Sequence, residues 1–98
     1  MNRIIWLPEA KRDLQQIRKY IARDSRTNAT RFVQRIRDSV NGIRRFPEAG
    51  SLVPESENEL REIFVSSYRI IYRVSDHGVE ILNVFHGARI LPDSLGRN

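Results

Sequence analysis

Tyr68-Arg69-Ile70-Ile71-Tyr72-Arg73-Val74 decides the fold of this chain. β-branched and aromatic residues dominate this stretch and no glycine or proline interrupts it, which is typical of a β-strand. Because strand side chains alternate between two faces, Arg69, Ile71 and Arg73 share one face. The other face carries a set that suits a buried core: Tyr68, Ile70, Tyr72 and Val74. Guanidinium groups on a central strand are costly unless their face is wet or meets an anionic partner, so this face is the first candidate for function.

Strands are predicted on both sides of this stretch in the sequence. Residues 60–65 are typical of a strand, which Ser66-Ser67 connects to the strand 68–74. Residues 79–86 are typical of a final strand, which follows the turn Asp76-His77-Gly78.

The tight connection at Ser66-Ser67 also predicts the strand register. If Val65 pairs with Tyr68, two more pairs follow along the strands, which are Ile63 with Ile70 and Arg61 with Tyr72. In this register three residues share the face of Arg69 and Arg73: Leu60, Glu62 and Phe64.

The first half of the chain predicts a short strand followed by two helices. Residues 3–6 are an apolar segment, and Pro8 suits the first turn of a helix running to about residue 23. Its apolar stripe has helical spacing: Ala10, Leu14, Ile17 and Ile21. After a turn-rich break at 24–28, a second stripe ends near Arg45: Phe32, Val33, Ile36, Val40 and Ile43.

These elements predict an α+β fold with the order β-α-α-β-β-β. We expect an antiparallel helix hairpin packed on one face of a small, mainly antiparallel sheet. Phe46-Pro47-Glu48-Ala49-Gly50 is predicted to stop the second helix, and the segment that follows, to Glu59, is predicted to be a loop. Residues 90–98 are predicted to be a flexible tail of a single domain covering residues 1–98. The sheet face away from the helices would stay open, lined by Arg69, Ile71 and Arg73.

Composition narrows the classes of function. The 98 residues include no cysteine and two histidines, which leaves out disulfide and thiolate chemistry and makes a zinc site unexpected. No segment resembles a membrane span or a signal peptide, so we expect a cytoplasmic protein without a membrane partner. The net charge of +5 favours anionic partners, and the basic flank of the second helix is interpreted as solvated or, alternatively, target-facing: Arg31, Arg35, Arg37, Arg44 and Arg45.

The order and spacing of several motifs resemble the RelE/ParE superfamily of bacterial toxins from type II toxin–antitoxin systems. The resemblance covers nearly the whole chain. Its motifs are Trp6-Leu7-Pro8-Glu9-Ala10, Asp13-Leu14 with Ile17, Tyr20-Ile21-Ala22, Phe32-Val33 with Ile36, Pro47-Glu48-Ala49-Gly50, Leu60-Arg61, residues 68–74, and His86-Gly87-Ala88-Arg89.

The resemblance implies one of two activities. RelE-like toxins cut mRNA on the ribosome without a metal, through basic side chains and a C-terminal Tyr or His; the corresponding residues here would be Arg69, His86 and Arg89. ParE-like toxins inhibit DNA gyrase as protein ligands, which implies no catalytic residue, cofactor or metal. Both kinds act in growth arrest or plasmid stabilisation and are neutralised by a cognate antitoxin, ParD-like or other, in a hetero-oligomer.

Two departures from the RelE pattern favour the ParE-like branch. The strand before the central one has Leu60, Glu62 and Phe64 where basic residues are expected, and the tail after Ile90 has neither Tyr nor His. A third reading is a toxin fold that has lost toxicity and only binds. The residues expected to bind antitoxin or target are Arg61, Arg69, Ile71, Arg73, His86 and Arg89.

For the charged residues and the histidine in this set there is also a structural alternative, in which the side chain has no part in binding. Arg69 and Arg73 could pair with Glu62 and Glu80 across strands. Arg61 could pair or stack structurally beside Tyr72, and Arg89 could be solvated. His86 could be a partly buried hydrogen-bonding group at the end of its strand.

Overall fold

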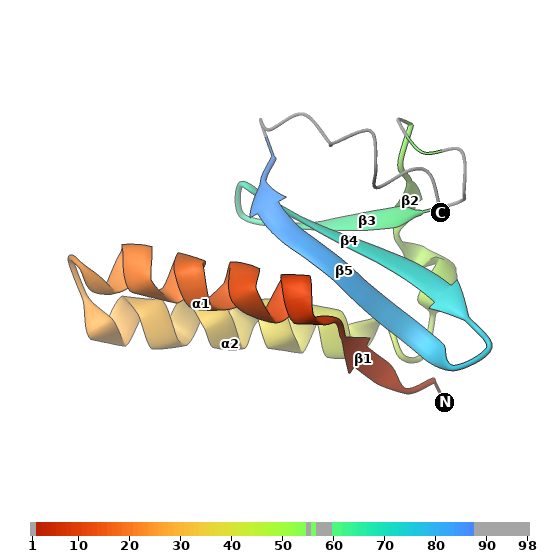
Figure 1. Ribbon diagram of the computed structural model, residues 1–98, viewed down its shortest axis with the longest axis horizontal. Helices are drawn as coiled ribbons and strands as arrows, with labels where there is room; N and C mark the ends of the chain where they lie inside the picture. The colour runs from red at the N-terminus through yellow and green to blue at the C-terminus, as the bar shows by residue number, and fades with distance from the viewer. Residues whose placement is uncertain (1, 55, 57–59, 88–98) are drawn as a thin grey trace.

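The computed structural model describes residues 2–54, 56 and 60–87, and this part of the chain forms a helix layer and a sheet layer (Figure 1). The elements follow one another as β1 (Ile4–Trp6), α1 (Pro8–Ala22), α2 (Arg26–Gly42), the 3-10 helix η1 (Pro47–Ala49), β2 (Ser51–Leu52), β3 (Arg61–Val65), β4 (Tyr68–Ser75) and β5 (Gly78–His86). This order confirms the predicted α+β class and adds one short strand, β2.

The strands form one mixed sheet in the order β1-β5-β4-β3-β2. β1 runs parallel to β5 and every other neighbouring pair is antiparallel. The predicted register of β3 on β4 is confirmed, because Val65 lies opposite Tyr68 and Arg61 lies opposite Tyr72. The strand 68–74 is therefore the middle strand of the sheet, as its apolar composition predicts.

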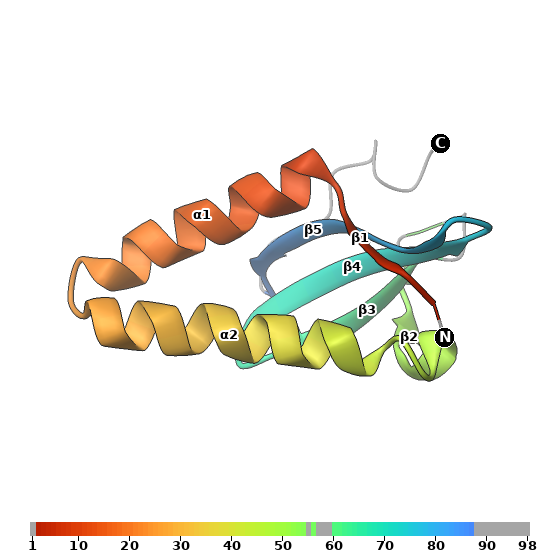
Figure 2. The ribbon, with the colours of Figure 1, turned by 90° about the horizontal axis from the view of Figure 1, so that it is seen from below.

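The two helices form the predicted antiparallel hairpin on one face of the sheet. Pro8 stands in the first turn of α1, and the Ser25 hydroxyl caps α2 by accepting a hydrogen bond of 3.1 Å from the Asn28 amide. α2 ends at Gly42 rather than near Arg45, since glycine supports a helix poorly. Figures 1 and 2 show that the turn of the hairpin projects well beyond the strands.

The main core lies between the hairpin and the sheet. The helices contribute Ala10, Leu14, Ile17, Ile36, Val40 and Ile43, and the strands contribute Val65, Ile70, Tyr72, Val79, Ile81 and Val84. The predicted stripes of both helices and the predicted core face of β4 supply most of this set. Only Val74, at the far end of β4, is exposed instead of buried.

The opposite face of the sheet carries a second apolar cluster, which corrects the prediction of an open face. Its buried members are Val53, Leu60, Ile71, Leu82 and Phe85. The segment predicted as the loop between Gly50 and Leu60 contributes to it: β2 lies there, and Val53 donates a backbone hydrogen bond of 2.8 Å to Leu60. The 3-10 helix η1 lies just before it, where the helix stop is predicted. β2 was missed because two residues are too short for a recognisable alternation.

A β-bulge in β5 explains why both faces of this strand are apolar. Ile71 pairs with Asn83 and Tyr72 pairs with Ile81, so Leu82 has no opposite residue on β4. The extra residue shifts the alternation, which sends Ile81 and Val84 to the helix side and Leu82 and Phe85 to the other side.

Asp13 of α1 supports the same part of β5. β1 ends at Trp6, beyond which β5 continues without it. The Asp13 carboxylate accepts hydrogen bonds there from the Val84 amide at 2.8 Å and from the Asn83 side chain at 3.3 Å. One carboxylate thus fixes the angle between α1 and the sheet.

Tyr72 and Arg61 hold the turn Pro47–Gly50 against the sheet. The fully buried Tyr72 hydroxyl donates to the Pro47 carbonyl at 2.6 Å and accepts from the Gly50 amide at 2.9 Å. Arg61 donates to the carbonyls of Gly50 at 2.8 Å and Glu48 at 3.1 Å. A Cβ at Gly50 would lie 2.5 Å from the Tyr72 hydroxyl and 2.8 Å from the Glu62 carbonyl, so only glycine fits here.

We expect Gly50→Ala to lower the free energy of unfolding by about 1–3 kcal/mol, because the added methyl group overpacks the site and displaces the Tyr72 hydroxyl. Gly42→Ala is the matched control, since a Cβ there meets nothing within 4 Å. It should raise the free energy of unfolding by up to about 1 kcal/mol through helix propensity. Urea unfolding followed by circular dichroism measures both changes, and equal stability of the two variants would contradict the packing argument.

Tyr72 also predicts a loss of stability at alkaline pH. Burial raises the pKa of the Tyr72 hydroxyl above the ordinary tyrosine value of 10.0. Above pH 10 the unfolded chain loses this proton while the folded chain keeps it, so the contribution of Tyr72 is complete below pH 10 and declines as the pH rises toward the folded pKa.

We expect Tyr72→Phe to destabilise the protein by about 1–3 kcal/mol at neutral pH, because the Pro47 carbonyl and the Gly50 amide lose their partner. This difference from wild type should shrink as the pH rises above 10, where the unfolded chain loses the Tyr72 proton first. Tyr20→Phe, at an exposed helix position, controls for the removal of a tyrosine hydroxyl. If the difference in unfolding free energy between Tyr72→Phe and wild type stays constant with pH, burial does not raise the pKa of the Tyr72 hydroxyl.

Candidate functional site

Arg69 is buried in an ion pair with Glu62. Both Nε and Nη2 of Arg69 approach Oε1 of Glu62, at 2.7 and 2.6 Å, and the side chains are only 8 % and 11 % exposed. A buried charge is stable only when it is paired, and removing one partner of such a pair costs about 3–5 kcal/mol. The Arg69 charge is therefore compensated within the fold.

Arg73, four residues further along β4, forms an equivalent pair. Its Nε and Nη2 lie 2.8 and 2.7 Å from Oε1 of Glu80, the residue directly opposite on β5. The Arg73 side chain is more accessible than that of Arg69, at 34 %. The predicted structural alternative, cross-strand pairing of Arg69 and Arg73 with Glu62 and Glu80, is thus what the structure contains.

The face that was expected to be an open, basic binding plane is instead apolar and charge-neutral. Ile71, between the two arginines, is completely buried in the second cluster. The prediction placed Arg69, Ile71 and Arg73 on one face correctly. The prediction of an exposed face was wrong, because Ile71 packs with Leu60 of the predicted strand and with Val53, which lies in a segment predicted to be a loop.

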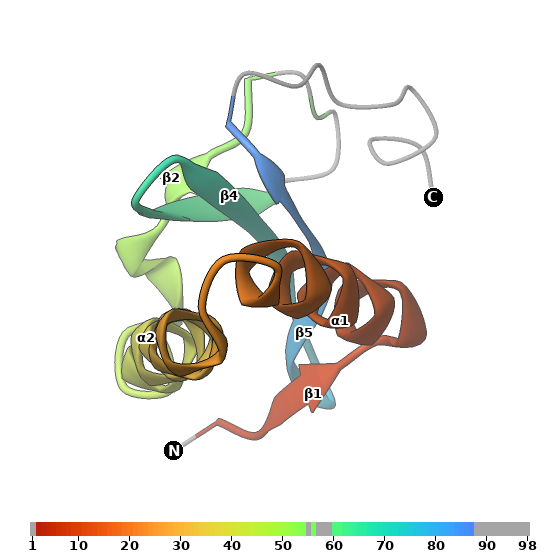
Figure 3. The same ribbon diagram turned by 90° about the vertical axis from the view of Figure 1, so that its left-hand side faces the viewer.

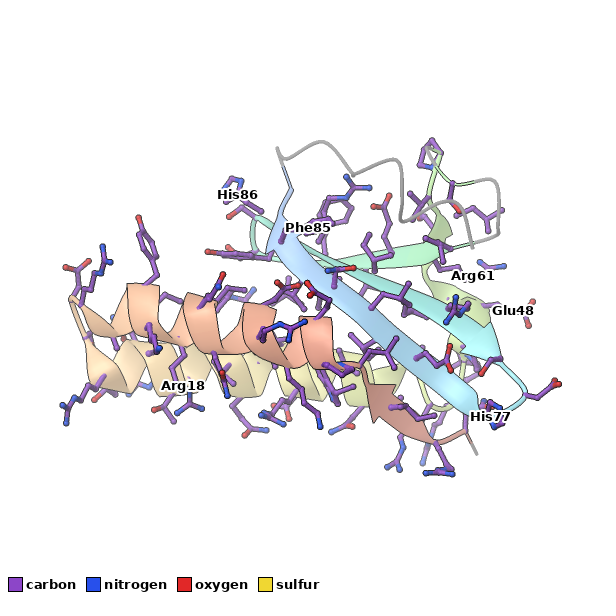
Figure 4. The ribbon with its side chains drawn as sticks, in the orientation of Figure 1. Arg18, Glu48, Arg61, His77, Phe85 and His86 are labelled. Carbon is purple, nitrogen blue, oxygen red and sulfur yellow. The ribbon has the colours of Figure 1, made fainter. Side chains whose placement is uncertain are left out.

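Arg61 and His86 belong to the other face and to different ends of the sheet. Arg61 lies opposite Tyr72 and His86 opposite Tyr68. Figure 4 shows them far apart, with Arg61 beside Glu48 and His86 at the end of β5. Arg61 has the structural role given above, and Arg89 lies outside the described residues.

His86 is exposed rather than partly buried, which corrects the structural alternative for this residue. Its ring meets Tyr68 edge-on with 5.6 Å between centroids, and Tyr68 in turn lies 5.4 Å from Phe32 of α2. The three rings join the end of β5 to the helix hairpin through β4.

The structure does not bring together Arg69 and His86, the two predicted nuclease residues that lie in its described part. Arg69 pairs with Phe85 and faces the second cluster, whereas His86 pairs with Tyr68 and faces the helix side. Their side chains lie on opposite faces of the sheet, and Arg69 is held by Glu62. A base and a cation so arranged cannot contact the same phosphate.

Two features are absent from residues 2–54, 56 and 60–87: a metal-ligating cluster and a membrane-spanning helix. No group of three or more His, Asp or Glu side chains among them could hold a metal ion. None of the helices in this part of the chain is long and apolar enough to cross a membrane.

An exposed apolar edge at β3 is the surface that the sequence did not predict as a site. Phe64 is 60 % exposed, and Leu52 of β2 is 54 % exposed. β2 covers β3 only at Arg61 and Glu62, so within the described chain the outer edge of β3 from Ile63 to Val65 has no neighbouring strand. Leu52 lies opposite Arg61 and Phe64 lies opposite Arg69, so these two side chains are on different faces of the sheet. We call Phe64 and the open stretch Ile63–Val65 the β3 edge surface; an exposed apolar side chain at an open strand edge marks an interaction site.

Comparisons with known proteins agree with this fold. A family model described as the ParE toxin of the type II toxin–antitoxin system parDE matches residues 4–91. The chain is 36 % identical to the candidate toxin Y4kP of Sinorhizobium fredii (strain NBRC 101917 / NGR234), over 96 % of this chain and 97 % of that protein.

A solved structure of a chromosomal ParDE toxin–antitoxin system from P. aeruginosa has the same fold. It superposes with a TM-score of 0.75 at 21 % identity, covering 88 % of this chain and 96 % of the other. The family match over nearly the whole chain and the extended identity to a toxin relative lead to one conclusion: the protein belongs to the ParE toxin family of type II toxin–antitoxin systems.

Proposed function

We propose that this ParE-family toxin inhibits DNA gyrase by binding it as a protein ligand. The observation that carries the proposal is the separation of Arg69 from His86 by the sheet, together with the pairing of Arg69 to Glu62. Metal-independent RNA cleavage needs a base and cations that converge on one phosphate. Without that convergence the toxin acts through surface complementarity, in the cytoplasm where gyrase works on DNA.

A cognate antitoxin is the second partner in the proposal. The β3 edge surface suits an extended antitoxin segment that adds a strand to the sheet beside Ile63–Val65. Phe64, which is 60 % exposed, would supply an apolar contact to such a segment. The net charge of +5 favours an antitoxin with acidic side chains.

The test of the proposed target is inhibition of gyrase supercoiling by the purified protein, with and without ATP. We expect inhibition at micromolar protein together with accumulation of cleaved DNA. Added antitoxin should restore supercoiling. Unchanged supercoiling would overturn the proposal and turn attention to the ribosome.

A translation-coupled assay separates the two kinds of toxin. Primer extension on translated mRNA should show no discrete cuts with this protein. Cuts that disappear in Arg69→Ala would support the ribosome-dependent nuclease instead. Expression without growth arrest would support a binding module that has lost toxicity.

We expect Phe64→Ser to weaken antitoxin binding at least tenfold, because exposed aromatic side chains at the centre of interfaces carry much of the binding energy. Val74→Ser is the matched control, since Val74 is also an exposed apolar strand residue but lies at the far end of β4. Isothermal titration calorimetry measures both affinities. Equal loss in the two variants, or none in Phe64→Ser, would place the antitoxin elsewhere.

A further inference from the structure

A basic furrow runs between the two helices on the side of β1. One cavity, of about 230 Å³, is lined by Trp6, Lys11, Leu14, Gln15, Arg18, Val33 and Arg37. A second cavity, of about 280 Å³, is lined by Arg18, Lys19, Ala22, Arg26, Ala29 and Thr30. Arg18 lines both cavities, and we call the two cavities together the interhelical furrow.

The views place the furrow away from the β3 edge surface. Figure 3, which looks along the hairpin, shows β1 on the opposite side of the helix pair from β2 and β4. The Trp6 lining puts one end of the furrow beside β1. Figure 4 shows Arg18 in the part of the hairpin that projects beyond the strands. The furrow therefore opens to solvent along the projecting hairpin.

Cations rim the furrow without carboxylates to neutralise them. Its lining includes five basic side chains, all exposed, and no Asp or Glu: Lys11, Arg18, Lys19, Arg26 and Arg37. Among the described residues none of the five forms a salt bridge. Nearby acidic groups are engaged elsewhere, since Glu9 pairs with Arg12 and Asp13 binds β5.

The apolar side chains in the floor of the furrow are nearly inaccessible. Leu14, Val33 and Ala29 line it but are at most 5 % exposed. An amphipathic helix needs an accessible apolar groove for its own apolar face. Trp6 is covered by the guanidinium of Arg37, which lies 6.0 Å from the ring centroid. A ligand of the furrow is therefore recognised by charge.

The cations are also arranged in two antiparallel rows. Lys11 and Arg18 follow one side of α1, and Arg26 and Arg37 follow the facing side of α2. At 1.5 Å rise per residue, the α1 row extends about 10 Å and the α2 row about 16 Å. With one phosphate per about 3.4 Å of each DNA strand, 16 Å corresponds to about five phosphates. Rows of this length match a regular polyanion better than a single small anion.

We propose that the interhelical furrow binds the phosphate backbone of duplex DNA. The contacts are ion pairs from Arg and Lys to phosphate oxygens, so binding is independent of sequence and sensitive to salt. This site is separate from the β3 edge surface proposed for the antitoxin, and it does not depend on gyrase inhibition.

Fluorescence anisotropy with a labelled 24-base-pair duplex of mixed sequence tests the proposal on the full-length protein. We expect wild-type protein to bind, with affinity that falls steeply between about 50 and 200 mM salt. Arg18→Gln/Arg26→Gln should weaken binding at least tenfold. It should also reduce the slope of log K against log salt by about two, because two phosphate contacts are lost. Lys11→Gln/Arg37→Gln, at the other end of the furrow, should act in the same direction.

Arg31→Gln/Arg35→Gln is the matched control. It removes the same net charge from exposed positions of α2 that line a different cavity, with Ile21, Asn28 and Phe32. We expect its affinity for DNA to stay within about twofold of wild type. Circular dichroism checks that all variants keep the fold.

Three outcomes would overturn the proposal. The first is no binding of DNA at 50 mM salt. The second is an equal loss of DNA affinity in the furrow variants and in the control, which would show that only the net charge of the protein matters for binding. The third is displacement of the duplex by a glutamate-rich 15-residue peptide at lower concentration than by unlabelled DNA, which would assign the furrow to an acidic protein segment.

Discussion

The pairing of Arg69 with Glu62 constrains the whole sheet. β4 is the middle strand and is covered on both faces, so a charge on it must be neutralised where it stands. Glu62 reaches Arg69 only because β3 is in the register that puts Val65 opposite Tyr68. The same register brings Arg61 and Tyr72 to the turn Pro47–Gly50. The ion pair and the buried tyrosine therefore select one alignment of β3, and a slip by one residue would bury an unpaired guanidinium.

Much of this arrangement could be predicted from the sequence because it follows from local periodicity. The helical stripes that begin at Ala10 and Phe32, and the alternation in residues 68–74, identify the hairpin, the central strand and the β3 register. The second apolar cluster could not be predicted in this way. It depends on the bulge at Leu82, which shifts the alternation of β5, and on Val53, in a segment without a recognisable pattern. Contacts distant in sequence leave no periodic signal.

The candidate site was predicted less well, for a related reason. Residue type indicates that Arg69 carries a charge, but only the tertiary structure shows that Glu62 neutralises it. The apolar β3 edge surface was missed because Phe64 was considered for its lack of positive charge and not for its exposure.

Charge divides the protein into two functional sides. On the sheet, Arg69 and Arg73 are paired with carboxylates, which leaves an exposed apolar edge at Phe64. The helices carry eight basic and three acidic residues, and the furrow cations have no carboxylate partner in the described chain. A protein ligand is best bound where apolar contacts are available, and a polyanion where unpaired cations are. Because the two surfaces lie on different sides of the hairpin, a toxin held by its antitoxin along β3 would keep the furrow open.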